Sequence, residues 1–136
     1  MNKINNYYIR DKFTAPLEIE HRPWGKYEVL LDTSTVKVKR ITVSPQQRLS
    51  YQYHHKRQEQ WTVVEGTLSI VLDSVVIEKE PGESISIPLG AHHRASNQTE
   101  KEVVFIEVQT GTYFGEDDIV RLDDDYKRIY QLLITF

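Results

Sequence analysis

Residues that could bind a metal ion stand in two groups in the middle of the chain. The first group contains Gln52, His54 and Glu59, and the second contains His93. Imidazole nitrogens and carboxylate oxygens are ligands that zinc and other divalent transition metals take from proteins. Gln52 is a fourth candidate, because it precedes His54 by two positions and side chains two apart on a strand point the same way. Brought together, these residues predict a metal-assisted reaction on a small polar substrate.

The remaining histidines are predicted to lie elsewhere. His55 and His92 each adjoin a candidate ligand, and adjacent side chains of a strand face opposite ways. We therefore expect His55 to be exposed to solvent, His92 to be structural, and His21 to lie on the surface. A lone histidine is more often a surface or core residue than a ligand, and it is the spacing of His54 to Glu59 that favours a ligand role.

Short strands and tight turns must position these residues. Alternating and β-branched stretches predict strands at residues 27–31, 36–43, 49–54, 59–64, 67–73, 75–79, 84–87, 93–96 and 103–109. Gly66, Gly82, Gly90 and Pro88 fit the turns between them. Many short strands at this spacing are typical of a β-sandwich or barrel.

The two ends of the chain differ from this pattern. Residues 1–20 read as an arm with one short strand at 7–9, and residues 21–136 as a single domain. An acidic run precedes residues 126–133, which have the apolar spacing of one amphipathic helix. The prediction is therefore an all-β domain with an N-terminal arm and a short C-terminal helix.

Composition limits the classes to which the protein can belong. Its 136 residues suffice for one domain with a core, and 39% apolar with 27% charged residues indicates neither a disordered nor a membrane-embedded chain. There is no cysteine, so disulfides and thiolate metal sites are excluded. The net charge of −3 argues against a nucleic-acid-binding surface. No apolar run has the length of a membrane span and the first residues lack the apolar core of a signal peptide, so we expect a cytoplasmic protein.

The spacing of the candidate ligands resembles the two motifs of the cupin superfamily. The spacing of the first motif is matched by Gln46, Gln52, His54, Glu59 and Gly66. Two identities differ, because Gln46 stands where the motif has a glycine and Gln52 where it has a histidine. The second motif is matched in full by Gly82, Pro88, Gly90, His93 and Asn97. This resemblance implies a cupin double-stranded β-helix, a small jelly-roll barrel that holds one divalent metal. Zinc is the first expectation, with manganese, cobalt and iron as alternatives.

Within the superfamily, the chain resembles the type II phosphomannose isomerases. The similarity covers roughly residues 20–130 and is carried by the segments 22–25, 38–41, 49–52, 59–61, 106–111 and 115–121. That family usually has a glutamine where this chain has Gln52, but histidines where it has Lys56 and Gln60. The family's cupin domain is often fused to a mannose-1-phosphate guanylyltransferase. Here we expect it to stand alone, with a separate guanylyltransferase as a candidate partner.

The resemblance implies the interconversion of mannose 6-phosphate and fructose 6-phosphate through an enediol. Such a reaction needs a group that moves a proton between two carbons. Glu107 is the candidate, because it shares a strand face with Phe105 and Gln109, and a carboxylate there is costly unless it serves the site or is paired. It could equally hold a substrate hydroxyl or pair with an arginine across the barrel. Arg121, in the family's last motif, is the candidate for catalytic assistance or anchoring.

The substrate phosphate calls for arginine or lysine. The basic candidates are Arg40, Arg48, Lys56, Arg57 and Arg94. Further candidates for contact with the substrate are Gln109, Glu116 and Asp117. The run of Glu116, Asp117 and Asp118 would ordinarily form a solvated turn. The cluster of Lys37, Lys39 and Arg40 is most often a solvated strand face.

Two other functions stay open, because a fold does not fix a function. One is a non-catalytic cupin that binds a sugar or nucleotide sugar, which the absence of histidine at Lys56 and Gln60 favours slightly. The other is a sugar-nucleotide epimerase or ketoisomerase. Because an open strand edge and an N-terminal arm invite pairing, we also expect a homodimer.

Overall fold

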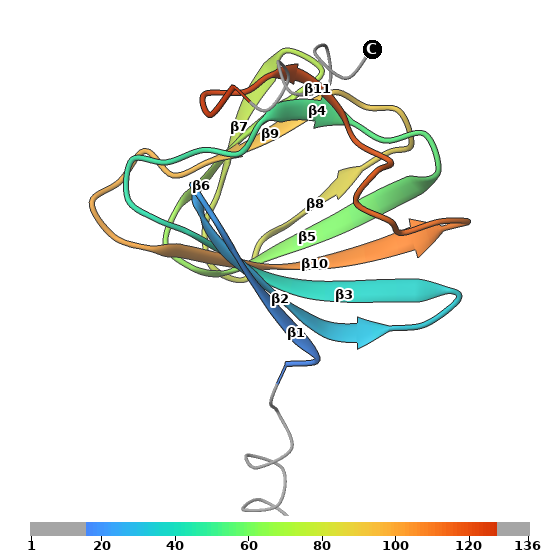
Figure 1. Cartoon of the computed structure of the whole chain (residues 1–136). Coiled ribbons are helices and arrows are strands. Elements are labelled where there is room, and N and C mark those ends of the chain that lie inside the picture. Colours follow the sequence, from blue (N-terminus) through green and yellow to red (C-terminus); the bar gives the residue numbers. More distant parts are fainter. Residues whose placement is uncertain (1–15, 128–136) are drawn as a thin grey trace, which may run out of the picture.

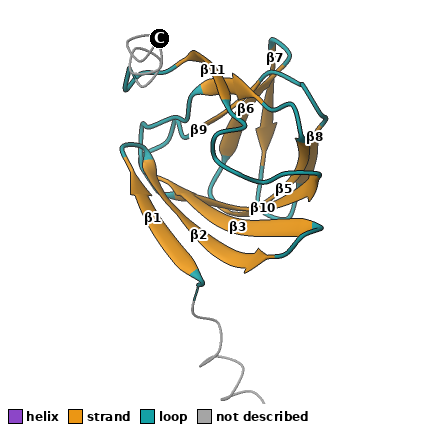
Figure 2. Ribbon diagram, turned by 45° about the vertical axis from the view of Figure 1, so that its right-hand side comes forward, coloured by secondary structure: helices purple, strands orange, loops and turns teal. Residues whose placement is uncertain are grey.

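Two antiparallel β-sheets make up the part of the chain that the computed structural model describes, residues 16–127, and no helix occurs in that range (Figure 2). The first sheet has the strand order β1 (Glu18–Arg22), β2 (Gly25–Asp32), β3 (Val36–Val43), β10 (Val103–Gly111), β5 (Arg57–Glu65), β8 (Ser84–Ile87). The second has the order β11 (Val120–Asp123), β4 (Tyr51–Tyr53), β9 (His93–Ser96), β6 (Leu68–Leu72), β7 (Val75–Lys79). Figure 1 shows the sheets facing each other as the two walls of a small barrel.

The side chains that face the space between the sheets change from apolar to polar along β3, β10 and β5. In the paired register of β3, β10 and β5, one row is Ile41, Phe105 and Val63, all of them buried. The next inward-facing row is Lys39, Glu107 and Trp61, and the one after it is Lys37, Gln109 and Glu59. Burial of the apolar rows supplies the main driving force for folding, so the polar rows sit on a rigid base.

The sequence predictions for the central strands are confirmed. The strands at 36–43, 75–79, 84–87 and 93–96 have the predicted bounds, and those at 27–31, 59–64 and 103–109 are longer by a few residues. The predicted strand 49–54 is shorter, because residue Arg48 makes only an isolated bridge to Ser96 and regular pairing begins at Tyr51. Alternating apolar residues identified these strands because each one has a single buried face.

The ends of the domain differ from the prediction where the structure describes them. Strand β1 begins at Glu18, so residues 18–20 of the predicted arm belong to the first sheet. Strand β11 was not predicted, since its residues show little alternation. The strand predicted at 7–9 lies outside the described residues, as does nearly all of the helix predicted at 126–133. In the described range, no helix is long and apolar enough to cross a membrane.

The tight turns use the backbone conformation that favours glycine. Gly66, Gly82 and Gly90 all have positive φ angles, as predicted for the turns they form. Gln46 also has a positive φ, of 61°, at the position where the cupin motif has a glycine. Its side-chain amide donates to the backbone oxygens of Gln98 and Thr99 and to the Glu100 carboxylate. These bonds offset part of the cost of a left-handed conformation in a non-glycine residue.

Candidate active site and metal centre

Three candidate metal ligands meet between the sheets, although they come from different elements. His54 follows β4, Glu59 lies on β5, and His93 begins β9. One ligand atom from each lies within 4.8 Å of the other two. The His54 Nε2 atom is 3.5 Å from Glu59 Oε2, and the His93 Nε2 atom is 3.7 Å from Glu59 Oε1. All three side chains are buried, so the cluster is enclosed rather than a chance grouping on the surface.

The hydrogen bonds of the two imidazoles favour a metal between them. His54 Nδ1 lies 2.7 Å from the backbone oxygen of Asp118, and His93 Nδ1 lies 2.9 Å from that of Ala91. A backbone oxygen can only accept, so each Nδ1 carries the proton and each Nε2 presents a lone pair to the cluster. Among the described residues, buried His93 Nε2 and Glu59 Oε2 have no hydrogen-bond partner. A buried lone pair without a donor is costly, and a bound cation would satisfy these atoms.

The protonation state of His54 also suits a ligand. Burial lowers the pKa of His54 to about 4, and the neighbouring Arg57 acts in the same direction. The imidazole is therefore neutral at pH 7, which is the form that binds a metal. Two nitrogens and a carboxylate fit zinc or another divalent transition metal, which these three residues would hold.

Gln52 lies beside this cluster, as the sequence predicts. It is the register partner of His93 across β4 and β9, and it faces the same cavity as Glu59. Its side-chain oxygen accepts a 3.0 Å hydrogen bond from Ser50 Oγ. An amide oxygen keeps a second lone pair beyond that bond, so Gln52 stays a candidate fourth ligand.

Glu107 lines the same cavity as Glu59 of the metal cluster. The carboxylate of Glu107 is buried and accepts a hydrogen bond from Gln109 Nε2, so its bond comes from an amide rather than from an arginine. Burial raises the pKa of Glu107, and the neighbouring Glu59 raises it further, while Lys39 and Arg57 oppose the change. A carboxylate with a raised pKa is a better proton acceptor than an ordinary one, which suits a group that removes a proton from carbon.

Lys39 is a cavity residue that the sequence interpretation missed. Its side chain is only 4% exposed, so the expectation of a solvated strand face is wrong for this lysine. The ammonium group pairs with Glu116 and lies 4.1 Å from the centre of the Tyr27 ring. The signal was present in the sequence, because Lys39 has the same parity as Ile41 and Val43, which face the core.

The cavity has more cationic than acidic lining residues. The acidic residues are Glu59, Glu107 and Glu116, and the cationic residues are Arg22, Lys39, Arg57 and Arg121. Its empty space, including the open mouth, is about 540 Å³. A divalent cation at Glu59 would raise the positive excess further, so the cavity is electrostatically suited to an anionic ligand.

Arg57 is the cation that contacts the metal cluster. It is 4% exposed, its Nη2 is 3.4 Å from His54 Nε2, and its Nε is 3.7 Å from Glu59 Oε2. Within residues 16–127, its Nε and Nη1 atoms are buried without a hydrogen-bond partner. Two buried donors of a guanidinium thus remain to be satisfied next to the metal cluster.

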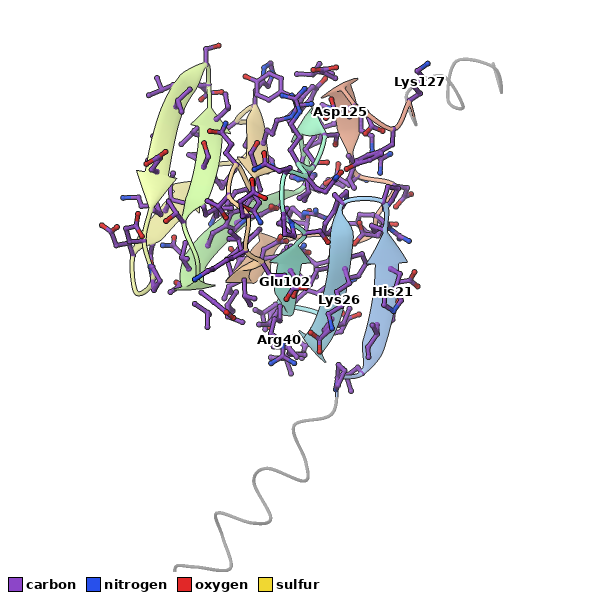
Figure 3. All side chains as sticks on the ribbon, turned by 90° about the vertical axis from the view of Figure 1, so that its left-hand side faces the viewer. His21, Lys26, Arg40, Glu102, Asp125 and Lys127 are labelled. Carbon is purple, nitrogen blue, oxygen red and sulfur yellow. The ribbon has the colours of Figure 1, made fainter. Side chains whose placement is uncertain are left out.

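Four of the predicted basic residues lie away from the cavity. Arg40 makes a two-bonded pair with Glu28 and lies at the outer surface near Lys26 (Figure 3). The other three are held by outer contacts: Arg48 pairs with Asp125, Arg94 donates to the backbone oxygens of Leu49 and Asp123, and exposed Lys56 lies over the ring of Tyr113. Because none of these contacts faces the cavity, we do not assign the phosphate to these four residues.

Some of the other predicted substrate contacts line the cavity and some do not. Glu116 reaches the cavity, whereas exposed Asp117 accepts a 2.5 Å hydrogen bond from Tyr113 Oη. Gln109 is fully enclosed and holds Glu107 rather than lining the cavity itself. Arg121 on β11 lines the cavity.

Asp118 is a second residue whose place the sequence did not indicate. It belongs to the loop between β10 and β11 and is buried. Its carboxylate accepts hydrogen bonds from the backbone N–H groups of His55 and Lys56, at 3.1 and 2.9 Å. With its backbone oxygen on His54 Nδ1, Asp118 therefore fixes both the ring and the backbone of a candidate metal ligand.

Comparison with known proteins shows the family to which the chain belongs. The family model described as "Mannose-6-phosphate isomerase C-terminal" matches residues 10–124. The chain belongs to this family. It is 45% identical over 109 residues to mannose-1-phosphate guanylyltransferase of Escherichia coli K12, and 45% identical over 108 residues to the xanthan biosynthesis protein XanB of Xanthomonas campestris. These matches cover 80% and 79% of this chain but only 23% of each relative, so the chain spans about a quarter of their length.

Solved structures show the same fold at low sequence identity. The capsular polysaccharide assembling protein CapF of Staphylococcus aureus matches 90% of this chain and 40% of its own, with a TM-score of 0.69 and 22% identity. An RmlC-like cupin from Shewanella frigidimarina matches 74% of this chain and 86% of its own, with a TM-score of 0.63 and 23% identity. The domain is therefore an all-β cupin, as the motif spacing predicted.

The two departures from the usual family sequence lie outside the cavity. Lys56 is exposed, and exposed Gln60 accepts a 2.6 Å hydrogen bond from Ser86 Oγ on the outer side of β5 and β8. Neither residue lines the cavity that contains Glu59 and Glu107. The preference that these departures gave to a binding module is therefore not supported by their positions.

Proposed function

We propose that the protein is a metal-dependent isomerase that interconverts mannose 6-phosphate and fructose 6-phosphate through an enediol. The observation that carries the proposal is the position of Glu107, a buried carboxylate in the same cavity as Glu59 of the candidate metal cluster. Membership of the mannose-6-phosphate isomerase C-terminal family supports the choice of substrate.

The residues of the cavity divide the work of such a reaction. His54, Glu59 and His93, with Gln52 as a fourth ligand, would hold the ion, and a divalent ion there supplies Lewis acidity toward the sugar's carbonyl oxygen. Glu107 accepts the proton from one carbon and returns it to the neighbouring carbon. Gln109 keeps the carboxylate in place through its hydrogen bond. Arg121, on the opposite sheet, anchors the substrate at the cavity lining.

The apolar floor of the cavity serves the same chemistry by limiting water. Trp61 lies next to Glu107 in the register and packs edge-on to His93, with ring centroids 5.6 Å apart. Trp24 and Ile41 line the cavity as well. Apolar side chains on this side of the cavity reduce the contact of Glu107 with water, which strengthens electrostatic interactions and protects a reactive enediol from side reactions.

A coupled assay tests the proposal. Purified full-length protein is supplied with zinc, manganese or cobalt and mannose 6-phosphate, and formation of fructose 6-phosphate is followed. Glu107→Gln should lower kcat by at least about 100-fold, because general acid–base catalysis contributes that much or more, while metal content stays at the wild-type value. The matched control is Glu102→Gln, since Glu102 is exposed and does not line the cavity. A normal rate in Glu107→Gln would remove the proton-transfer assignment, and binding without turnover under all three metals would favour a sugar-binding cupin.

Three further proposals concern the setting of the reaction. We propose a homodimer, because β1 is an edge strand among the described residues and carries exposed Ile19 next to exposed Leu17, and light scattering showing a monomer at micromolar concentration would reject it. We propose a cytoplasmic location, which cell fractionation tests. Because relatives include mannose-1-phosphate guanylyltransferases, we propose a separate guanylyltransferase as a partner, and co-purification from cells tests a direct association.

A further inference from the structure

Glu116 holds an unusual place for an acidic residue of a loop. It lies between β10 and β11, its side chain is 40% exposed, and its carboxylate pairs with the Lys39 ammonium at the cavity. Burial raises the pKa of Glu116, but Lys39, followed by Arg57 and Lys37, lowers it below its ordinary value. Three cations thus act on one carboxylate that contacts Lys39, so this part of the cavity stabilises negative charge.

Lys39 and Arg57 are buried, whereas the Glu116 carboxylate that pairs with Lys39 is partly exposed. Lys39 and Arg57 are each 4% exposed. In the described part of the chain, the Nε and Nη1 donors of Arg57 have no hydrogen-bond partner. A buried cation costs free energy unless it is paired, and Arg57 meets the Glu59 carboxylate only at 3.7 Å, which leaves these two donors without a hydrogen bond. The cluster therefore has hydrogen-bond donors left for an anion with more acceptor oxygens than a carboxylate.

We propose that Lys39 and Arg57 form a binding subsite for the phosphate group of a phosphomonoester, and that Glu116 occupies this subsite until a phosphate displaces it. The identity of the phosphomonoester as a sugar phosphate rests on the proposed function. Phosphate binding, which tests the subsite, does not depend on isomerase activity. A phosphate dianion offers three acceptor oxygens to an ammonium and a guanidinium, where Glu116 offers two oxygens and one charge.

The position of Glu116 makes the exchange feasible. Its loop has no regular pairing between Thr112 and Ile119, so the side chain can turn toward solvent without breaking a strand. Asp118 in the same loop stays fixed by its bonds to His55 and Lys56, so movement of Glu116 need not disturb His54. Lys39 also lies next to Glu107 in the β3–β10 register, which places a phosphate bound there within one sugar's reach of the proposed proton-transfer group.

Phosphate binding to the metal-free full-length protein tests the proposal. Inorganic phosphate is titrated by calorimetry into chelator-treated wild-type protein and three variants. Lys39→Met should weaken binding by at least about tenfold, because a charge-assisted hydrogen bond is lost. Glu116→Gln should tighten it by at least about threefold, because the competing charge is gone while the shape is kept. The matched control, Lys56→Met, removes an exposed cation outside the cavity and should change the affinity by less than about twofold.

The opposite results would overturn the subsite. Equal phosphate affinity in wild type and Lys39→Met, or weaker binding in Glu116→Gln, contradicts it. If Lys39→Met does not fold, as judged by circular dichroism, Glu116→Gln still decides, because its side chain lies at the cavity mouth.

A second ligand separates this proposal from the proposed function. Mannose 6-phosphate should follow the same order of affinities as inorganic phosphate across the variants, whereas mannose should not compete with phosphate. If the phosphate results hold and no isomerisation occurs, the subsite stands and the isomerase proposal fails. If isomerisation occurs and Lys39→Met changes neither phosphate affinity nor KM, the isomerase stands and the subsite fails.

Discussion

The inner and outer faces of the same short segments carry residues of the same type with different surroundings. His54 is buried in the metal cluster, while its neighbour His55 is exposed and packs edge-on to Tyr53. His93 is buried in the cluster, while exposed His92 stacks on Tyr53 from the other side. The alternation of side chains along a strand therefore separates chemistry from surface packing between adjacent residues.

The cationic and acidic residues repeat this division. Lys39 faces the cavity, whereas Arg40 pairs with Glu28 on the outer face. Asp118 is buried and bonds to the backbone, whereas Asp117 is exposed and bonds to Tyr113. Each of these four inner residues therefore has an adjacent outer residue of similar chemistry, which serves as its natural control.

The largest contrast is expected between His93, which begins β9, and His92, the residue before it. His93→Ala should weaken zinc binding by at least about 100-fold, since loss of a second-shell partner alone costs tenfold to hundredfold. His92→Ala should leave zinc affinity unchanged. Competition with a chromophoric chelator measures both, and equal affinities in the two variants would break the comparison of inner and outer faces.

The adjacent aspartates should differ next. Asp118→Ala removes the acceptor for the N–H groups of His55 and Lys56 and leaves the backbone near His54 without its clamp. We expect zinc affinity to fall by about tenfold or more, in the range of second-shell changes, while Asp117→Ala has no effect. The same chelator competition decides, with Asp118→Asn as an intermediate because it keeps one acceptor oxygen. A fall in both alanine variants would show that the whole loop matters rather than Asp118.

The stability of the metal-free protein should depend on the protonation of His54. In the unfolded chain the pKa of His54 is that of an ordinary histidine, and in the folded chain burial lowers it to about 4. The unfolded state then binds more protons between these values, so the free energy of unfolding should decrease as pH falls. Between pH 7 and pH 5 the decrease should be roughly 2 kcal/mol from this residue. Urea denaturation measures it; a His54→Gln variant should lack this part of the pH dependence, while His55→Gln should keep it.

The smallest effect is expected where the chain departs from its family. Lys56→His and Gln60→His, which restore the usual family residues, act on the outer side of β5 and its preceding turn. Because neither residue lines the cavity, kcat/KM for mannose 6-phosphate should change by less than about twofold. A larger gain in the coupled assay would mean that these outer positions influence the site after all.

Much of the fold was predictable because its signals are local. Alternation of apolar residues gave the central strands, and the positive φ angles of Gly66, Gly82 and Gly90 fit the turns. Strand β11 lacks such alternation, and the bounds of β1 were obscured by its position next to the arm. These elements form through pairing with β4 and β2, which a single sequence does not reveal.

The site was predictable to the extent that its residues follow motif spacing. His54, Glu59 and His93 come together as the spacing suggested, and Glu107 faces inward as its strand parity required. The pairing of Lys39 with Glu116 joins residues far apart in the sequence, so no local pattern contains it. The clamp formed by Asp118 was likewise hidden, because its partners are two backbone N–H groups and an imidazole in a distant turn.

The most direct test of the account is the location of a bound metal. Crystals of the full-length protein grown with zinc should show one strong anomalous peak at the zinc edge, coordinated by His54 Nε2, His93 Nε2 and a Glu59 carboxylate oxygen at about 2.0–2.2 Å. A peak at the outer histidines His55 and His92, or no peak between the sheets at saturating zinc, would contradict the proposed metal centre and the isomerase that depends on it.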